Sequence, residues 1–453
     1  MKLVYQPSDR PKFGQLIVLA IQQLLAIMAA TLVVPVIVGN DMSPAAALFG
    51  AGCGTLVYVL FTKGKSPVFL GSSFAFINSM FAAFAGGVSM SLGYLGMIIG
   101  AIMAGLVYVT IAAVVKAVGV GWINKLMPAV VIGPTVAIIG LSLAGNAVSD
   151  AQTGEVYVDG VMTASPLVCI LCALVTLFAT ILASTFGKKT AKLIPFIIGI
   201  GAGYAVSVLF TIIGLAAGID ALKIIDFSYF SNLLVDGKIA VSTFVSAPSF
   251  IFVKAFGAFG ELSGQYLGTI AAAYIPVAFV VFAEHIADHK NISSILEKDL
   301  LEDPGLSRTL LGDGVGSMVG AFFGGCPNTT YGESVACVAI TGNASVVTII
   351  AAAIGALLIA FISPFVAIVD SIPPCVMGGV CIALYGFISV SGLKMIKNVD
   401  LEQNRNLFVV STIFICGIGG LTLNFGQVTI TSIATALILG IIVNTMLSKA
   451  DQK

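Results

Sequence analysis

Apolar runs recur along the whole chain, from about Gln15 to Leu447, with short polar connections between them. Most runs have the roughly 20 residues that a helix needs to cross the hydrocarbon core of a bilayer. The 453 residues are 58% hydrophobic and 9% charged, which leaves no room for a soluble domain. We therefore expect an all-α polytopic membrane protein with fourteen transmembrane segments, at residues 14–39, 44–62, 68–86, 91–116, 122–147, 166–186, 193–215, 267–289, 309–325, 326–341, 343–370, 373–393, 406–422 and 427–447.

The basic residues predict how these segments are oriented. Fourteen crossings place both termini on one side, and every Lys and Arg except Lys223, Lys238 and Lys254 then falls on that same side. Loops rich in Lys and Arg stay in the cytoplasm, so both termini are predicted to be cytoplasmic. The longest connection, residues 216–266, is predicted to lie outside, where short amphipathic helices would form a lid or spacer.

Seven segments in each half would make the two halves inverted relative to each other. The third and tenth segments support this pairing, because in each a proline precedes two small hydroxyl residues and an aromatic residue: Pro67, Ser72, Ser73 and Phe74 in one, and Pro327, Thr329, Thr330 and Tyr331 in the other. Both are too polar for lipid contact, and interrupted backbone survives in a membrane only where protein or a cavity covers it. Matched interrupted segments mark a midplane substrate site, which we expect between residues 72–75 and 329–333.

Two acidic residues lie in apolar surroundings. Glu284 ends the apolar run that begins at Tyr274, and Glu333 follows the polar stretch that begins at Pro327. An acidic residue at the centre of a membrane helix costs about 2.5 to 3.5 kcal/mol, so it normally faces a partner, a cavity or a substrate. Glu284 and Glu333 are the leading candidates for substrate binding; for Glu333 the alternative is pairing with a neighbouring backbone N–H.

Asp288 follows Glu284 by four residues and so shares its helix face. Like charges one turn apart disfavour double ionisation, which suits a pair that gains and loses a proton in each transport cycle. Glu284 and Asp288 are therefore the predicted proton-coupling residues. In the alternative interpretation, Asp288 belongs to the solvated cytoplasmic end of the eighth segment. Asp313 is either a helix cap at that end or a residue of a proton path.

Other classes of function fit the sequence poorly. The net charge is zero, from 21 basic and 21 acidic residues, so nothing favours nucleic acid as a partner. An ATP-driven pump would need a soluble nucleotide-binding domain, and a hydrolase would need a nucleophile with a nearby base; neither pattern is present. Cys169 and Cys172 form a C-x-x-C without a second ligand pair. We expect no metal, no cofactor and no enzymatic activity, and an ion gradient as the energy source.

Five stretches in order resemble the nucleobase/ascorbate transporter family of nucleobase:cation symporters, and within it the bacterial uracil permeases, along almost the whole chain. They are Gly71-Ser72-Ser73-Phe74-Ala75-Phe76, Ala283-Glu284-His285-Ile286, Asp303-Pro304-Gly305-Leu306-Ser307-Arg308, Pro327-Asn328-Thr329-Thr330-Tyr331-Gly332-Glu333 and Val376-Met377-Gly378-Gly379.

This resemblance implies a core domain and a gate domain that move against each other, a short strand in each interrupted segment, and commonly a homodimer. The core would comprise residues 14–116 and 267–370, and the gate residues 122–215 and 373–447. By motif position, Glu284 and Glu333 would hydrogen-bond the base. The rest of the pocket would be Ser73, Phe74, Tyr331, Gly332 and, from the gate, Tyr385.

The resemblance also implies proton-coupled uptake of a nucleobase across the bacterial cytoplasmic membrane, with uracil as the leading substrate and xanthine or uric acid as the alternative. Three positions depart from the family pattern. Gln23 stands where the family usually has His, Ser334 stands where its signature has Asn, and Asp288 stands where uracil permeases have His and the purine-transporting branch has Asp.

Overall fold

The computed structural model describes residues 3–119, 121–122, 127–235, 237–425 and 428–448. Residues 123–126 of the predicted fifth segment and residue 427 at the start of the predicted fourteenth lie outside the described residues. In the described part, eight helices are long and apolar enough to span a membrane: α1 (Phe13–Val38), α2 (Pro44–Phe61), α4 (Met90–Val118), the consecutive α6 and α7 (Ala129–Asp150), α8 (Pro166–Phe186), α10 (Pro195–Ala217), α13 (Gly264–Leu296) and α18 (Pro374–Met395).

Shorter helices fill the remaining predicted segments. The third segment contains the 3-10 turn η1 (Phe74–Phe76) and α3 (Ile77–Ala83), and the rest are α14 (Leu306–Gly324), α15 (Gly332–Thr341), α16 (Val346–Ile359), α17 (Ser363–Asp370), α19 (Asn404–Ile418) and α20 (Ser432–Leu447). The fifth segment divides into α6 (Ala129–Ser142) and α7 (Ala144–Asp150). The helix α13 extends beyond the predicted eighth segment, 267–289, by about two turns to Leu296.

The connections hold only short elements. Residues 216–266 form η2 (Asp220–Leu222), α11 (Ser228–Ser231), η3 (Val241–Thr243), α12 (Ile251–Ala255) and η4 (Ala258–Glu261). Elsewhere lie two hairpins and two short helical segments: β2 (Tyr157–Val158) with β3 (Val161–Met162), β5 (Leu423–Phe425) with β6 (Val428–Ile430), α9 (Lys189–Leu193) and the π-helical turn η5 (Leu301–Gly305).

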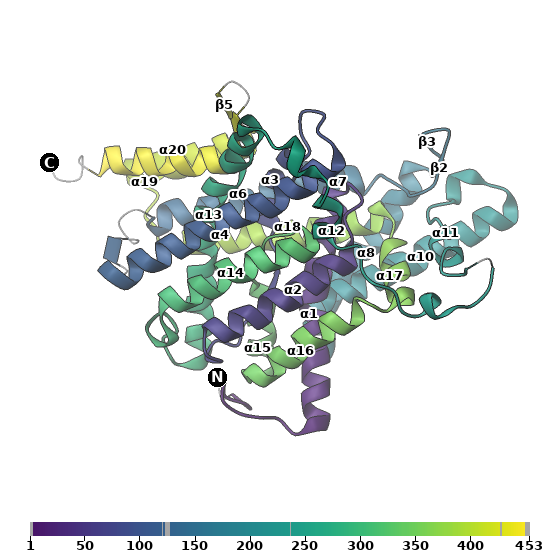
Figure 1. Cartoon of the computed structure of the whole chain (residues 1–453), viewed down its shortest axis with the longest axis horizontal. Helices are drawn as coiled ribbons and strands as arrows, with labels where there is room; N and C mark the ends of the chain where they lie inside the picture. Colours follow the sequence, from purple (N-terminus) through teal and green to yellow (C-terminus); the bar gives the residue numbers. More distant parts are fainter. Residues whose placement is uncertain (1–2, 120, 123–126, 236, 426–427, 449–453) are drawn as a thin grey trace.

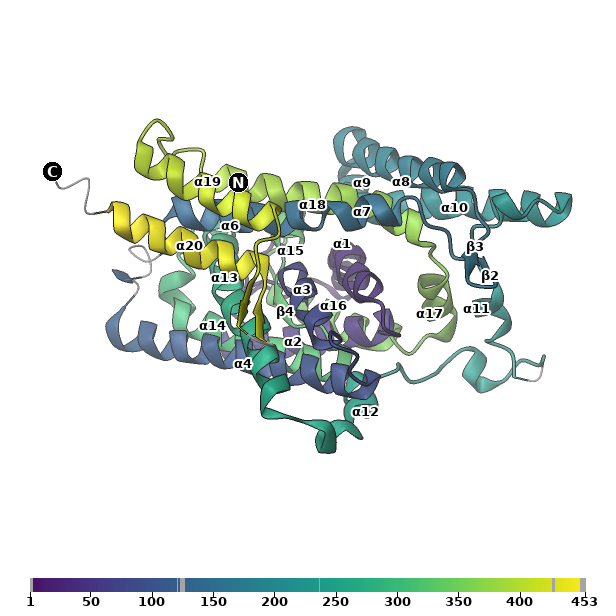
Figure 2. The ribbon, with the colours of Figure 1, turned by 90° about the horizontal axis from the view of Figure 1, so that it is seen from above.

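The helices pack as two groups (Figures 1 and 2). The first group consists of α1 to α4 and α13 to α16, in which α14 lies against α2 and α4, and α16 lies against α1 and α2. The second group consists of α6 to α10 and α18 to α20, in which α18 packs on α6 and α8, and α19 packs on α6 and α20. Figure 2 shows α18, α6, α8 and α10 of the second group as a layer along one side of α1, α2 and α14.

Glycine allows the backbones of the first group to approach each other closely. A Cβ added to Gly54 of α2 would lie 2.7 Å from the carbonyl oxygen of Gly316 in α14, and a Cβ on Gly316 would lie 2.8 Å from the carbonyl oxygen of Gly54. Lipid is as apolar as the side chains, so the hydrophobic effect does not hold helices together inside a membrane. Van der Waals packing does so instead, and small residues strengthen it because they let the two backbones come close. The α2–α14 contact is therefore fixed by its glycines.

The two interrupted segments meet as a two-stranded antiparallel sheet inside the first group. β1 (Leu70–Ser72) pairs with β4 (Asn328–Thr330), with Gly71 opposite Thr329. The Thr55 hydroxyl accepts a hydrogen bond from Leu70 N–H at 2.9 Å, and Ser73 N–H donates to the Pro327 carbonyl at 2.9 Å. These bonds supply partners for backbone that no longer follows a helix, which interrupted membrane segments require.

Gly54→Ala tests the α2–α14 contact. The added methyl group meets the Gly316 carbonyl, so we expect a loss of stability of about 1 to 3 kcal/mol, as for overpacked cores. The measurement is the apparent Tm of the purified protein in detergent. Gly201→Ala in α10 is the matched control, because nothing lies within 4 Å of a Cβ at Gly201. An equal fall in both variants would contradict the proposed role of the glycines.

Candidate functional site

A cavity of about 390 Å³ lies between the two helix groups. The second half of α13 and the start of α15 form one wall, and α9, the start of α10 and the last turns of α18 form the other. The cavity lies toward the face that holds the N-terminal stretch, where Tyr5 pairs with Asn343 just beyond α15. Both helix groups therefore contribute to its lining.

Three carboxyl groups gather on the α13–α15 wall. Glu284 and Asp288 come from neighbouring turns of α13, and Glu333 lies in the first turn of α15, directly after Gly332. Glu284 and Glu333 are half-buried, and Asp288 is 7% exposed. Because β4 ends at Thr330, the first turn of α15 begins at the cavity, and its N–H groups have no partner within the helix.

Asp288 is hydrogen-bonded to the end of β4. Its Oδ2 accepts a hydrogen bond from the Thr330 hydroxyl at 2.9 Å, and Thr330 is fully buried at the end of β4. The interpretation of Asp288 as a solvated helix end is therefore wrong. It failed because α13 does not end at residue 289, so Asp288 lies inside the helix rather than at its terminus.

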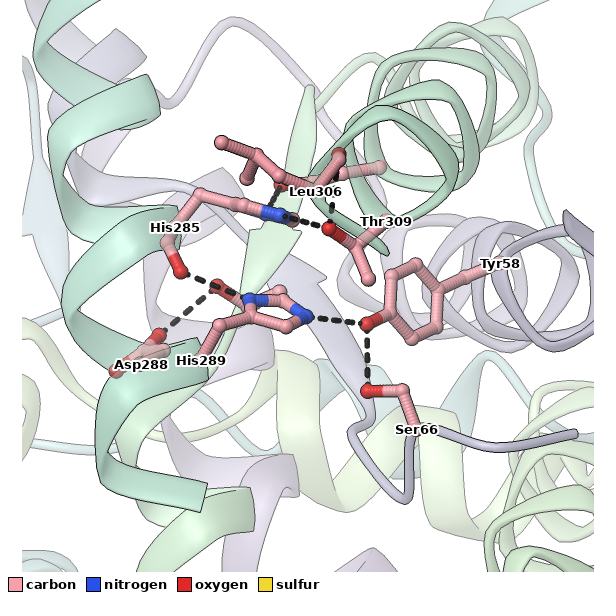
Figure 3. A network of polar contacts seen from close by, with 9 residues as sticks. Tyr58, Ser66, His285, Asp288, His289, Leu306 and Thr309 are labelled. Atoms are coloured by element: carbon pink, nitrogen blue, oxygen red, sulfur yellow. Dashed lines mark hydrogen bonds and ion pairs between the residues drawn. The ribbon is translucent and has the colours of Figure 1, made fainter. Parts of the chain in front are cut away.

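A buried polar network lies behind the carboxyl groups (Figure 3). The two ring nitrogens of His285 contact Asp313 Oδ2 at 2.7 Å and Thr309 Oγ1 at 2.9 Å, so α13 is tied to α14. His285, Asp313 and Thr309 are each 0% exposed. The interpretation of Asp313 as a cap at a solvated helix end is therefore wrong, since its carboxyl group is inside the first helix group. His285 is a hydrogen-bonded interior residue.

The same network continues to α2. The His289 ring stacks on that of His285 with 4.0 Å between centroids, and its Nε2 lies 2.7 Å from the Tyr58 hydroxyl. Tyr58 in turn donates to Ser66 Oγ at 2.7 Å. Figure 3 shows these side chains in a row between α13 and the segment that carries Ser66. A face of α13 next to the one that lines the cavity is thereby held in one orientation.

The other residues expected at the site lie deeper than the cavity wall. Among the predicted pocket residues, Gly332, Glu284 and Glu333 line the cavity, whereas Ser73, Phe74, Tyr331 and Tyr385 do not. Phe74 makes an edge contact with Tyr385 across the two helix groups, at 5.9 Å between ring centroids. The Tyr331 hydroxyl donates to the Ser72 carbonyl at 2.6 Å, which supports β1.

Two of the three departures from the family pattern contact each other. The Gln23 side-chain amide donates to Ser334 Oγ at 2.6 Å, and Ser334 Oγ also accepts the Phe69 N–H at 2.9 Å. Both side chains are buried. Gln23 and Ser334 therefore form one hydrogen-bonded support that joins α1, α15 and the residue before β1.

Four polar residues of the cavity were not predicted from the sequence. Lys192, Asn291, Ser391 and Lys394 line it together with the carboxyl groups. From the sequence alone, the two lysines count only among the basic residues on the predicted cytoplasmic side, because both lie beside loop residues that carry no motif. Their position depends on the packing of α9 and α18 beside α13, which no local pattern reports.

A second cavity, of about 640 Å³, lies at the opposite ends of α1 and α18. It is lined by both helix groups and by the connections, including Asp41, Lys254, Tyr229 and Glu155. Burial raises the pKa of the Glu155 carboxyl to about 7, although the backbone N–H of Asp226 bonds to it at 3.4 Å. Along α18, Tyr385 lies between residues 387–395, several of which line the first cavity, and Pro374, which lines the second.

The chain is similar to known proteins along almost its whole length. The model of the Permease family matches residues 14–426. The chain belongs to this family. A uracil permease of Bacillus caldolyticus is 38% identical over all of this chain and 96% of its own length, and one of Escherichia coli K12 is 35% identical over 96% of this chain and 91% of its own. The predicted resemblance to bacterial uracil permeases is thus confirmed, and the chain is a multi-pass membrane protein of a transporter family.

Solved transporters have the same fold at much lower identity. The transmembrane domain of the cyanobacterial bicarbonate transporter BicA aligns with a TM-score of 0.64 at 15% identity, covering 97% of this chain and all of that domain. Murine Slc26a9 in its inward-facing state aligns with a TM-score of 0.63 at 11% identity, covering 98% of this chain and 69% of that protein. The prediction of a helical polytopic transporter fold is confirmed.

His285→Phe tests the buried network. It leaves Asp313 Oδ2 without its ring partner, and a buried hydrogen-bonding group left without a partner costs about 1 to 3 kcal/mol. We expect a clearly lower apparent Tm in detergent. Lys65→Met is the control, because it removes an ion pair with Asp303 whose side chains are 48% and 70% exposed, and such pairs contribute about 0 to 1 kcal/mol. Equal Tm values for the two variants would contradict a structural role for the network.

Proposed function

We propose that this permease takes up uracil across the bacterial cytoplasmic membrane in symport with protons. The observation that carries the proposal is the cavity between the two helix groups, in which Glu284 and Glu333 face one space from two different segments. Relatives named uracil permeases, at 35 to 38% identity over 96% or more of this chain, support the choice of substrate.

A neutral pyrimidine ring matches the polar groups of this wall. Its ring N–H groups would donate to the carboxyl groups of Glu284 and Glu333, and its carbonyl oxygens would accept from the first-turn N–H groups of α15. Hydrogen bonds to charged groups contribute about 1.5 to 3 kcal/mol each, whereas an anionic substrate would meet repulsion from the same carboxyl groups. This chemistry favours an uncharged base over an anion, although the structural neighbours include anion transporters.

Proton coupling would use Glu284 and Asp288. The two carboxyl groups are one helical turn apart, and Thr330 holds Asp288 through a single hydrogen bond, so a proton can exchange at the free oxygen. One proton moving inward through 100 mV supplies about 2.3 kcal/mol, which corresponds to roughly fifty-fold accumulation of a neutral solute.

Transport would follow alternating access of a core domain against a gate domain. The first helix group corresponds to the core and the second to the gate, with fourteen spans in two inverted repeats and two chains in a dimer. With both termini in the cytoplasm, the carboxyl-lined cavity faces inward and the second cavity faces outward. Phe74 and Tyr385 then belong to the barrier between them.

Uptake of xanthine or uric acid is the second candidate. Asp288 favours it, because the resemblance places Asp at this position in the purine-transporting branch of the family. The larger ring system would also occupy more of a cavity of about 390 Å³.

Glu333→Gln tests the substrate site. Losing the charged acceptor removes a charge-assisted hydrogen bond, so we expect accumulation of labelled uracil to fall about tenfold or more. The assay uses cells that lack their own uracil permease, with the amount of carrier in the membrane measured by immunoblot. Glu302→Gln, at an exposed carboxyl outside the cavity, should leave uptake unchanged. Normal uptake by Glu333→Gln would remove Glu333 from the site.

A competition assay distinguishes the two candidate substrates. Unlabelled uracil should suppress uptake of labelled uracil at the lowest concentration among uracil, thymine, xanthine, hypoxanthine and uric acid. Stronger competition by xanthine would support the second candidate.

An uncoupler tests the proton coupling, and it should abolish the accumulation of labelled uracil. Asp288→Asn should lower the accumulation of labelled uracil more than it lowers equilibrative exchange of uracil. Accumulation that resists the uncoupler would exclude proton coupling.

A further inference from the structure

The cavity carries opposite charges on its two walls. Lys192 lies in the last turn of α9 and Lys394 in the last turn of α18, both in the second helix group, facing the carboxyl groups of α13 and α15. Both lysines are exposed, and within the described part of the chain neither side-chain ammonium group has an ion pair or hydrogen bond. A basic residue in a last turn also complements the helix dipole. That role does not explain why two such helix ends meet at one cavity.

The cavity is larger than one pyrimidine ring requires. Its volume of about 390 Å³ lies in the range of sites that hold drug-sized ligands, roughly 300 to 1,000 Å³. Asn291 also lines the cavity, about one turn beyond Asp288 on α13. The three carboxyl groups are buried or half-buried, whereas Asn291 and the two lysines are exposed, so the amide and the cations lie nearer to solvent than the carboxyl groups.

We propose that this cavity also binds a nucleoside monophosphate from the cytoplasmic side, with its base at Glu284 and Glu333 and its phosphate at Lys192 and Lys394. The inference rests on the base uptake proposed above. Lysine binds phosphate as a point charge, and a phosphate monoester carries about −1.5 to −2 charges at neutral pH. The Asn291 amide is placed to meet the sugar hydroxyls.

Such binding would make the carrier subject to inhibition by the nucleotide that is formed from the imported base. A free base becomes a nucleotide when its ring nitrogen displaces the leaving group at C1 of an activated ribose 5-phosphate donor and the ring N–H proton is released. The resulting nucleotide has the base that the cavity accepts. A nucleotide anchored at both ends occupies the inward-facing cavity and holds the two groups apart. Import then slows as the nucleotide accumulates.

The test compares nucleotide with nucleoside by calorimetric titration of the purified full-length protein. The probes are uridine 5′-monophosphate against uridine, and xanthosine 5′-monophosphate against xanthosine, so the identity of the base does not decide the outcome. In one pair or both, the nucleotide should bind about tenfold or more tightly than its nucleoside, the factor that one charge-assisted hydrogen bond supplies. Inorganic phosphate alone should bind weakly.

The variant Lys192→Gln/Lys394→Gln should abolish the advantage of nucleotide over nucleoside. Lys290→Gln, an exposed lysine on α13 that does not line the cavity, is the control and should keep that advantage. Equal binding of nucleotide and nucleoside by the unmodified protein overturns the proposal, as does an advantage that survives the double substitution. Uracil uptake is measured separately, so its absence would count against the proposed function and leave the nucleotide result readable.

An alternative role for the lysines has its own signature. If they only pair with the carboxyl groups when the cavity closes, the double variant should change the ratio of exchange to net uptake, and nucleotide and nucleoside should bind equally. That combination also overturns the proposal.

Discussion

Backbone hydrogen bonding in the interrupted segments is the constraint on which the site depends. Chain that leaves the helix inside a membrane protein must find other partners for its N–H and C=O groups. Here β1 and β4 pair with each other, and Thr55, Pro327 and Ser334 supply the bonds at their ends. Because β4 ends at Thr330, α15 begins at the cavity, and Glu333 is carried by a helix start rather than by a mobile loop.

The polar network on the neighbouring face of α13 also helps to position the carboxyl groups of the cavity. A buried polar side chain costs free energy unless its hydrogen bonds are made, so His285, His289 and Asp313 can be buried only in the arrangement that pairs them. That arrangement sets the rotation of α13 about its axis, and with it the direction of Glu284. The carboxyl groups of the cavity are thus positioned by strands on one side and by a histidine network on the other.

The sequence predicted the features that depend on local pattern. Apolar runs predicted the helices, proline with small hydroxyl residues predicted the two interrupted segments, and isolated acids in apolar surroundings predicted Glu284 and Glu333. It did not predict contacts between distant residues, such as Tyr58 with His289 or Gln23 with Ser334. Asp288 was ambiguous because helix ends are the least certain part of a pattern, and the two lysines depend on how separate helices pack.

The contact of Gly54 with Gly316 has a mechanical consequence. Two helices that touch backbone to backbone have no intervening side chains whose rotamers could absorb a displacement, so neither can slide past the other without a clash of carbonyl groups. The contact between α2 and α14 therefore resists sliding of one helix along the other. Relative motion of helices is then confined to contacts where side chains interdigitate.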